Sequence, residues 1–441
     1  MNRTHRIFGI QFFKSIRFVL VVLIILSGIL NNHVSAQTPS ALLMLGDTTR
    51  YNSTAMLMLE GNGVIGSNVL DIQFFDKSIF GGHLADEHLD RLSGNLKSLN
   101  RAGFGATAGL SYFNFTDTLF GNANRGLKVG VHSNYHASLS YGRDVFKLIY
   151  RGNNSFRGDS VELGPLSGNY QSWQKFSIGV FNKKTLSSVS LSLVAGDNYQ
   201  SLILDDANLF TSMQGDSLAL GYRGEYLSSD TIKSGWANGS GLGLAVDIDY
   251  NLPLADGKGV ISVALRDFGF VAWNKQTRHM QFDSTTTWTG LQVNDLFDLD
   301  TDSLDLPNLT DSIHRTVKRK SFVAALPMSI HLRYAHYFSK KGYYDFALSI
   351  WPNRAALPML SAGVNYIFTD KLVASARGSF GGYGTWGAGA ELQYLPNSNW
   401  LIRMGTGNLV GFVSEKANSR DVYFSLCKFF PYKKRMMSDE R

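Results

Sequence analysis

Residues 127–141, LKVGVHSNYHASLSY, decide the fold because their side chains alternate between two chemical classes. Odd positions from Leu127 to Tyr141 are mostly apolar and end in aromatics, whereas even positions from Lys128 to Ser140 are polar, small or charged. Successive side chains of a β-strand point to opposite faces, so this stretch predicts one long strand between two different solvents. It exceeds the usual strand of about 5–6 residues and reaches the roughly 9–11 that cross a bilayer at a tilt.

The same alternation recurs in segments 103–112, 242–250, 261–266, 329–334, 344–350, 360–368 and 386–394. Glycine is abundant at 44 residues and proline scarce at 9, as a chain rich in strands requires. A secreted β-sandwich would alternate in the same way, so strand length and loop pattern must decide between the two architectures.

The first 36 residues predict a secretory signal peptide. A basic segment (Arg3, Arg6, Lys14, Arg17) precedes an apolar run over 18–30 and the small residues Val34-Ser35-Ala36. We expect cleavage after Ala36, because the run is shorter than the ~20 residues of a membrane-anchor helix. The only cysteine is Cys427, which excludes a disulfide and a lipoprotein attachment at Gln37. The leader holds four of the positive charges behind the net +7, so the mature chain has no nucleic-acid-binding charge pattern.

Loop lengths favour a barrel. Tight polar turns are predicted at 142–144, 182–185, 251–258, 339–342, 369–371 and 396–399, and long connections at 151–172, 196–239 and 273–320. Pairs of strands fit between the turns, so all long connections fall on one side, as in outer-membrane barrels. Aromatics before the turns predict an interfacial girdle of Phe181, Tyr250, Tyr337, Tyr366, Phe368 and Tyr394.

We therefore predict an all-β fold: a transmembrane, antiparallel, up-and-down β-barrel of about fourteen strands over residues 102–430. Sixteen strands are possible if Ser217–Tyr226 and its neighbours also span. A basic periplasmic tail follows at 431–441, and an N-terminal extension at 37–101 precedes the barrel. The extension contains an amphipathic helix with a leucine stripe from Leu89 to Leu99, and the helix either plugs the lumen or packs beneath it.

Several short sequence segments resemble those of an exported Gram-negative barrel family of unknown function: 266–273 (RDFGFVAW), 282–291, Ala325-Leu326-Pro327 and 120–126 (FGNANRG). The family is broadly similar to the FadL and PorV types of fourteen-stranded barrel with an N-terminal hatch. The resemblance implies the fold. It assigns no role, because FadL-type barrels carry hydrophobic molecules, PorV-type barrels serve secretion and surface attachment, and fold does not imply function.

The polar strand faces supply candidate lumen residues: Lys128, His132, Asn134, His136, Asp247, Asp249, Arg266, His331, Arg333 and Glu391. Four residues of strand separate His132 and His136 by roughly 13 Å, too far to share one metal ion. Asp247, Asp249 and Arg266 predict an interior salt-bridge ladder, and a selectivity constriction is the alternative.

An acidic loop offers a weak cation contact at Asp298, Asp300, Asp302 and Asp305. It lacks the glycine and the final acid of a calcium-binding EF-hand loop, so a solvated acidic loop is the preferred interpretation. We predict no metal centre and no cofactor.

The chain lacks the serine-hydrolase, zinc-protease and phosphate-loop motifs, so we predict no enzyme. The favoured hypothesis is a passive outer-membrane channel for small or hydrophobic molecules. The alternative is a non-transporting partner or anchor barrel of a secretion or surface-attachment assembly. Expected partners are outer-membrane lipid, lipopolysaccharide and other envelope or secretion proteins, and no nucleic acid.

Overall fold

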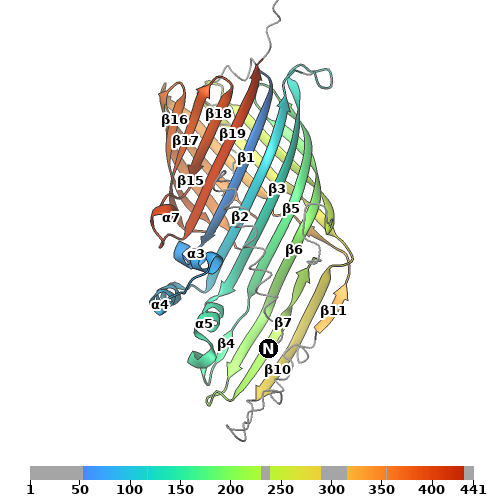
Figure 1. Ribbon diagram of the computed structural model, residues 1–441, viewed down its shortest axis with the longest axis vertical. Coiled ribbons are helices and arrows are strands. Elements are labelled where there is room, and N and C mark those ends of the chain that lie inside the picture. Colours follow the sequence, from blue (N-terminus) through green and yellow to red (C-terminus); the bar gives the residue numbers. More distant parts are fainter. Residues whose placement is uncertain (1–52, 117, 230–238, 290–314, 354, 432–441) are drawn as a thin grey trace, which may run out of the picture.

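The computed structural model describes residues 53–116, 118–229, 239–289, 315–353 and 355–431. Within these residues fourteen antiparallel strands close a barrel in sequence order, with the last paired to the first (Figure 1). They are β1 (Ser53–Ser67), β2 (Leu99–Asn114), β3 (Arg125–Gly142), β5 (Leu166–Asn182), β6 (Ser188–Thr211), β8 (Gly241–Pro253), β9 (Gly259–Trp273), β13 (Ser329–Ser339), β14 (Gly342–Ile350), β15 (Leu357–Thr369), β16 (Leu372–Gly382), β17 (Trp386–Asn397), β18 (Trp400–Thr406) and β19 (Ser419–Pro431). The predicted fold class and strand number are confirmed.

The barrel has a turn end and a loop end. Short connections join β5 to β6, β8 to β9, β13 to β14, β15 to β16 and β17 to β18 at the turn end, as predicted. Ser53 also pairs with Pro431 there. The sixth predicted turn, Gly142–Asp144, is wrong: these residues lie at the loop end, where β3 ends and a helix, α5 (Arg143–Arg151), begins.

The predicted barrel start at residue 102 is also wrong. Residues Ser53–Ser67 form β1, which pairs with β2 and β19 along nearly its whole length. The predicted amphipathic helix exists as α4 (Asp86–Asn95), but it belongs to the β1–β2 connection at the loop end, together with α3 (Ile72–Phe80). It therefore neither plugs the lumen nor packs beneath it at the turn end. The predicted signal peptide, residues 37–52 and almost all of the predicted tail lie outside the described residues.

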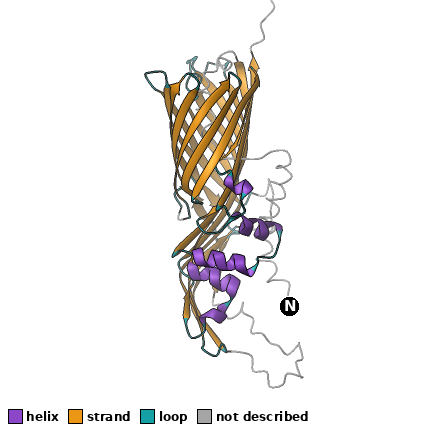
Figure 2. Ribbon diagram, turned by 90° about the vertical axis from the view of Figure 1, so that its left-hand side faces the viewer, coloured by secondary structure: helices purple, strands orange, loops and turns teal. Residues whose placement is uncertain are grey.

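A sheet extends beyond the barrel at the loop end (Figures 1 and 2). β6 pairs with β8 over 188–196 and then with β7 (Ser217–Ser228) over 200–211. β10 (Arg278–Thr289), β11 (Arg315–Arg319) and β4 (Ser160–Glu162) complete this arm, so the strand predicted at Ser217–Tyr226 adds nothing to the barrel. β12 (Phe322–Ala325) instead continues the barrel wall beside β9. The sheet divides beside Trp273, where a Cβ at Gly196 would come within 2.7 Å of the indole ring.

Helices cover the outer face of the strand ends next to the arm (Figure 2). Leu89, Leu92 and Leu96 pack with Tyr141 of β3 and with Phe146 of α5 in one buried cluster. The carboxylate of Asp71 caps α3, and it also accepts hydrogen bonds from His88 and Arg91 at 2.9 and 2.7 Å. A 3-10 helix (Asn153–Phe156) and α7 (Val410–Val413) are the remaining helices of the described residues. No helix in the described ranges is long and apolar enough to cross a membrane.

The outward faces of the barrel strands are apolar. Exposed side chains include Phe176, Ile178, Leu191, Leu193, Leu242, Leu244, Phe346, Leu360 and Val364. Of the six predicted girdle aromatics, Tyr250, Tyr366, Phe368 and Tyr394 are exposed near the turn end. Phe181 and Tyr337 instead pack in inward-facing clusters. An exposed apolar surface of this extent is typical of a barrel surrounded by lipid.

Replacing Leu92 with alanine should loosen the helices while the barrel persists. Leu92 is 1% exposed, so its truncation should destabilise their packing by about 2–5 kcal/mol. Limited proteolysis should cut residues 72–95 faster in L92A, with the barrel still resistant to unfolding on an unheated detergent gel. L99A truncates a leucine that is 42% exposed and should match the unmodified chain. Equal cleavage of L92A and L99A would contradict this packing.

Candidate functional site

The ten residues assigned to the lumen from the sequence are all placed in the barrel interior. Eight of them line one cavity of about 280 Å³: Lys128, His132, Asn134, His136, Asp247, Asp249, Arg266 and His331. The other two, Arg333 and Glu391, are buried in ion pairs on inward strand faces. These residues lie on the inward faces of β3, β8, β9, β13 and β17, where side chains alternate with outward ones.

One group of charges connects β3, β5, β8 and β9. The Lys175 ammonium lies 2.9 Å from Asp247 and 2.7 Å from Asp267. Arg266 and Lys128 both donate to Asp249, the latter at 3.5 Å. These ion pairs join side chains of neighbouring strands, and together they form the interior salt-bridge ladder that was expected of this region.

A β-bulge in β9 adds the charged side chain of Asp267 to this group. The β8–β9 register shifts between Val246 and Ile248, and Asp267 takes a positive φ of 54°. As a result Arg266 and Asp267, which are adjacent in sequence, both line the cavity. An extra residue in one strand breaks the period-two pattern, so alternation alone could not have placed Asp267.

A second group lies across β13 to β19. Asp345 accepts hydrogen bonds from Arg333 at 3.0 Å and from Arg377 at 2.9 Å. Glu391 accepts one from Arg403 at 2.6 Å and another from the Tyr423 hydroxyl. Buried charges of this kind are tolerated only when partners satisfy them.

The histidines have separate partners. His132 pairs with Glu60 at 3.2 Å, and His136 is hydrogen-bonded to the Tyr383 hydroxyl at 2.6 Å. His331 contacts two serine hydroxyls at 2.8 and 3.0 Å. Among the described residues, no three His, Cys, Asp or Glu side chains are grouped so as to hold a metal ion.

Apolar side chains occupy the lumen at the turn end. One cluster contains Met56, Met58, Phe113, Phe115, Phe181, Leu186, Leu401, Cys427 and Phe429, and a second contains Val260, Ala335, Tyr343 and Val373. Of these, only Met58 and Phe113 line the cavity. The cavity therefore borders the first cluster at Met58 and Phe113. The two clusters together are here called the apolar layer.

Several interior residues were missed. Lys175 and Arg403 follow the alternation of their own strands and could have been found by it. Glu60 lies in β1, which was not recognised as a strand. Trp351 and Tyr383 lie just beyond the ends of β14 and β16, where no periodic pattern predicts which way a side chain points. The acidic positions Asp298, Asp300, Asp302 and Asp305 lie outside the described residues.

A model of the family of unknown function DUF5723 matches residues 57–402. The chain belongs to that family. The resemblance seen in the sequence is thereby confirmed. No curated protein is significantly similar to the chain in sequence.

Three solved protein structures are similar to the chain at low sequence identity. The toluene transporter TodX of Pseudomonas putida is 11% identical over 88% of this chain and 92% of its own, with a TM-score of 0.41. TbuX, a toluene transporter of Ralstonia pickettii, is 9% identical over 91% and 95%, with a TM-score of 0.39. A FadL homologue of Pseudomonas aeruginosa is 11% identical over 91% and 96%, with a TM-score of 0.40. These likenesses are too distant to assign a cargo.

Glu391 should contribute strongly to stability. E391Q leaves the Arg403 guanidinium, itself 2% exposed, without its counter-charge, so we expect a loss of about 3 kcal/mol or more. Urea unfolding of the protein in lipid vesicles, followed by tryptophan fluorescence, measures this loss. E415Q makes the same chemical change at an exposed position and should stay within about 0.5 kcal/mol. A loss in E391Q no larger than in E415Q would show that the pair is not needed.

Proposed function

We propose that this chain is an integral outer-membrane barrel that passes small uncharged molecules from the cell exterior toward the periplasm. The observation that carries the proposal is a closed fourteen-stranded barrel with an apolar exterior and a cavity of about 280 Å³ within it. In this proposal the loop end faces outward, the turn end faces the periplasm, and lipid and lipopolysaccharide surround the apolar strand faces.

Paired charges favour a small uncharged cargo over an ion. Almost all charges of the described lumen have a partner. Five acidic side chains are paired with cationic ones, Glu60 is paired with His132, and Asp421 accepts hydrogen bonds from Thr406 and from two backbone N–H groups. The paired cations are Lys128, Lys175, Arg266, Arg333, Arg377 and Arg403, and their acidic partners are Asp247, Asp249, Asp267, Asp345 and Glu391. A selectivity ring that attracts ions presents one sign of charge to the pore. A purely hydrophobic molecule would displace water from these polar groups without replacing its hydrogen bonds.

The apolar layer supports a gated channel in preference to an open pore. Phe181 is 1% exposed, and its ring packs edge-to-face against Phe113 and Phe115, each with centroids 5.2 Å away. Cargo that reaches the cavity must displace these rings to leave at the turn end. These rings belong to the barrel strands and the turns between them, so the barrel itself forms the barrier to passage.

F181A should raise permeability. Truncating Phe181 removes the centre of the ring cluster, so neutral solutes should enter vesicles containing F181A several-fold faster than those containing the unmodified chain, measured by vesicle swelling. F176A truncates an outward-facing phenylalanine on the same strand and should leave swelling unchanged. An unheated detergent gel checks that both variants fold, since loss of a buried phenylalanine costs about 3–5 kcal/mol.

The arm favours the second candidate, a partner or anchor barrel. Its strands project beyond the barrel and add no wall to it (Figure 1). The same swelling experiment separates the two functions, because a channel needs no partner protein. If neither the unmodified chain nor F181A admits any neutral solute, the channel proposal is wrong and a partner role is favoured.

A further inference from the structure

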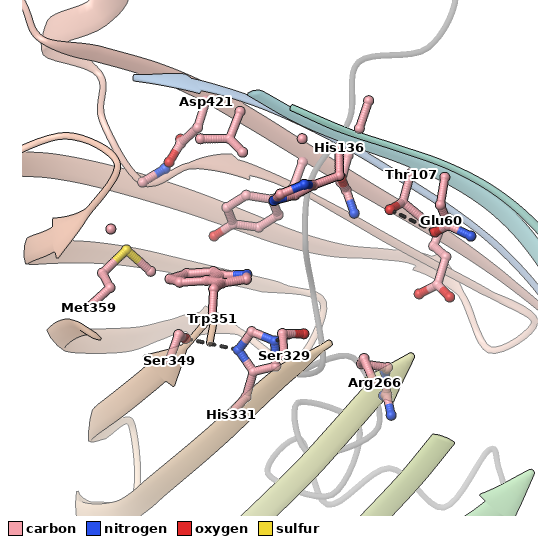
Figure 3. A pocket seen from close by; sticks show the side chains of 18 of the residues that line it. Glu60, Thr107, His136, Arg266, Ser329, His331, Ser349, Trp351, Met359 and Asp421 are labelled. Carbon is pink, nitrogen blue, oxygen red and sulfur yellow. Dashed lines mark hydrogen bonds between the residues drawn. The ribbon is translucent and has the colours of Figure 1, made fainter. Parts of the chain in front are cut away.

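Trp351, His331 and Tyr383, here called the aromatic corner, line the cavity and lie at or next to the loop-end termini of β14, β13 and β16. Trp351 and His331 are labelled in Figure 3. The Trp351 ring lies nearly parallel to that of Tyr383, at 30° with centroids 6.5 Å apart. His331 meets the same indole edge-on, at 84° and 5.9 Å. All three residues line the cavity, but His331 and Tyr383 are buried, so the half-buried Trp351 presents most of the ring surface to whatever enters it.

Hydrogen bonds hold two of these rings, those of His331 and Tyr383, in place. His331 is fixed by Ser349 through Nδ1 at 2.8 Å and by Ser329 through Nε2 at 3.0 Å. His136 fixes the Tyr383 hydroxyl from β3, on another part of the wall. Burial raises the pKa of Tyr383, which stands in the turn between β16 and β17, so the phenol stays neutral. A ring surface fixed in advance binds a ligand with little loss of side-chain entropy.

Polar groups line the same cavity around the rings. Ser361 of β15 and Ser379 of β16 are paired across the ladder, and neither is fully buried. Asp421 lies on the other side of the rings from His331 (Figure 3). Its carboxylate accepts hydrogen bonds from the Thr406 hydroxyl at 2.9 Å and from the backbone N–H groups of Gly407 and Asn408.

These features together select a ligand class. The rings favour a molecule with a flat apolar face, and the hydroxyls and carboxylate favour one whose edge carries hydrogen-bond donors and acceptors. Nearby Arg377 is already engaged by Asp345, so the ligand need not carry charge. A cavity of about 280 Å³ is at the small end of ligand sites, which suits a single ring. A pyranose has this combination, with C–H groups on its faces and hydroxyls around its edge.

We propose that the aromatic corner binds one ring of a neutral sugar, stacked on Trp351 with its hydroxyls toward Asp421, Ser361 and Ser379. This inference rests on the proposed function, because it names the class of cargo for the same lumen. The site would hold the sugar above the apolar layer until the layer opens.

Binding to the full chain in detergent tests the site. Saturation-transfer NMR and isothermal titration with glucose, maltose and N-acetylglucosamine should detect binding of at least one sugar. W351A should weaken that binding at least tenfold, whereas W351F keeps a ring and should retain most of it. W400A removes an indole at the turn end, where it contacts Lys428, and should bind like the unmodified chain. S379F fills the cavity from the neighbouring wall and should abolish binding without removing any aromatic ring.

Three results would overturn the site: no binding of any of the three sugars, equal binding by W351A and W400A, or binding of toluene or adenine in their place. If W351A fails to fold, W351F and S379F still decide the question. Vesicle swelling gives an independent outcome. Sugar binding without swelling would retain the site and reject the channel, whereas swelling without sugar binding would retain the channel and reject the site.

Discussion

The structure depends on the mutual neutralisation of the charges that face the lumen. A barrel of fourteen strands leaves an interior that short side chains cannot fill, so long arginine and lysine side chains extend inward to meet carboxylates on neighbouring strands. Asp345 of β14 illustrates this. It accepts hydrogen bonds from Arg333 of β13, Asn365 of β15 and Arg377 of β16, and it thereby connects four consecutive strands. Each such contact is stable only while both partners are present.

This constraint explains how well the sequence predicted the fold. Where one strand face meets lipid and the other meets the charged lumen, alternation is clear, and β3 could be recognised from its own residues. β1 was not predicted as a strand because both faces of its first half are apolar. Met56 and Met58 point into the apolar layer, while Leu57 and Leu59 occupy the alternate positions. The predicted turn at Gly142–Asp144 was wrong because a glycine followed by polar residues also suits the start of a helix. The helix α5 is stabilised there by residues of α4, which are distant in sequence.

The candidate site was predictable only in part, for a related reason. Charges on regular strands were placed from the sequence, but the partners that neutralise them were mostly not identified, since register and barrel closure bring together residues far apart in the chain. His136 and Tyr383 are 247 positions apart and share a hydrogen bond. Asp267 faces the cavity because of a bulge, and Trp351 enters it from just beyond β14. Local periodicity contains none of this information.

The two kinds of lumen contact differ in how easily they move. Separating a buried ion pair costs about 3–5 kcal/mol when one partner is left alone, whereas an apolar ring that changes rotamer keeps most of its apolar surroundings. The charged groups of β8, β9, β14 and β17 should therefore stay fixed as the barrel works, and motion should concentrate in the apolar layer around Phe181. If the proposed channel function holds, that division would make the charges a scaffold, the aromatic corner the place where a cargo is held, and the turn-end rings the part that opens.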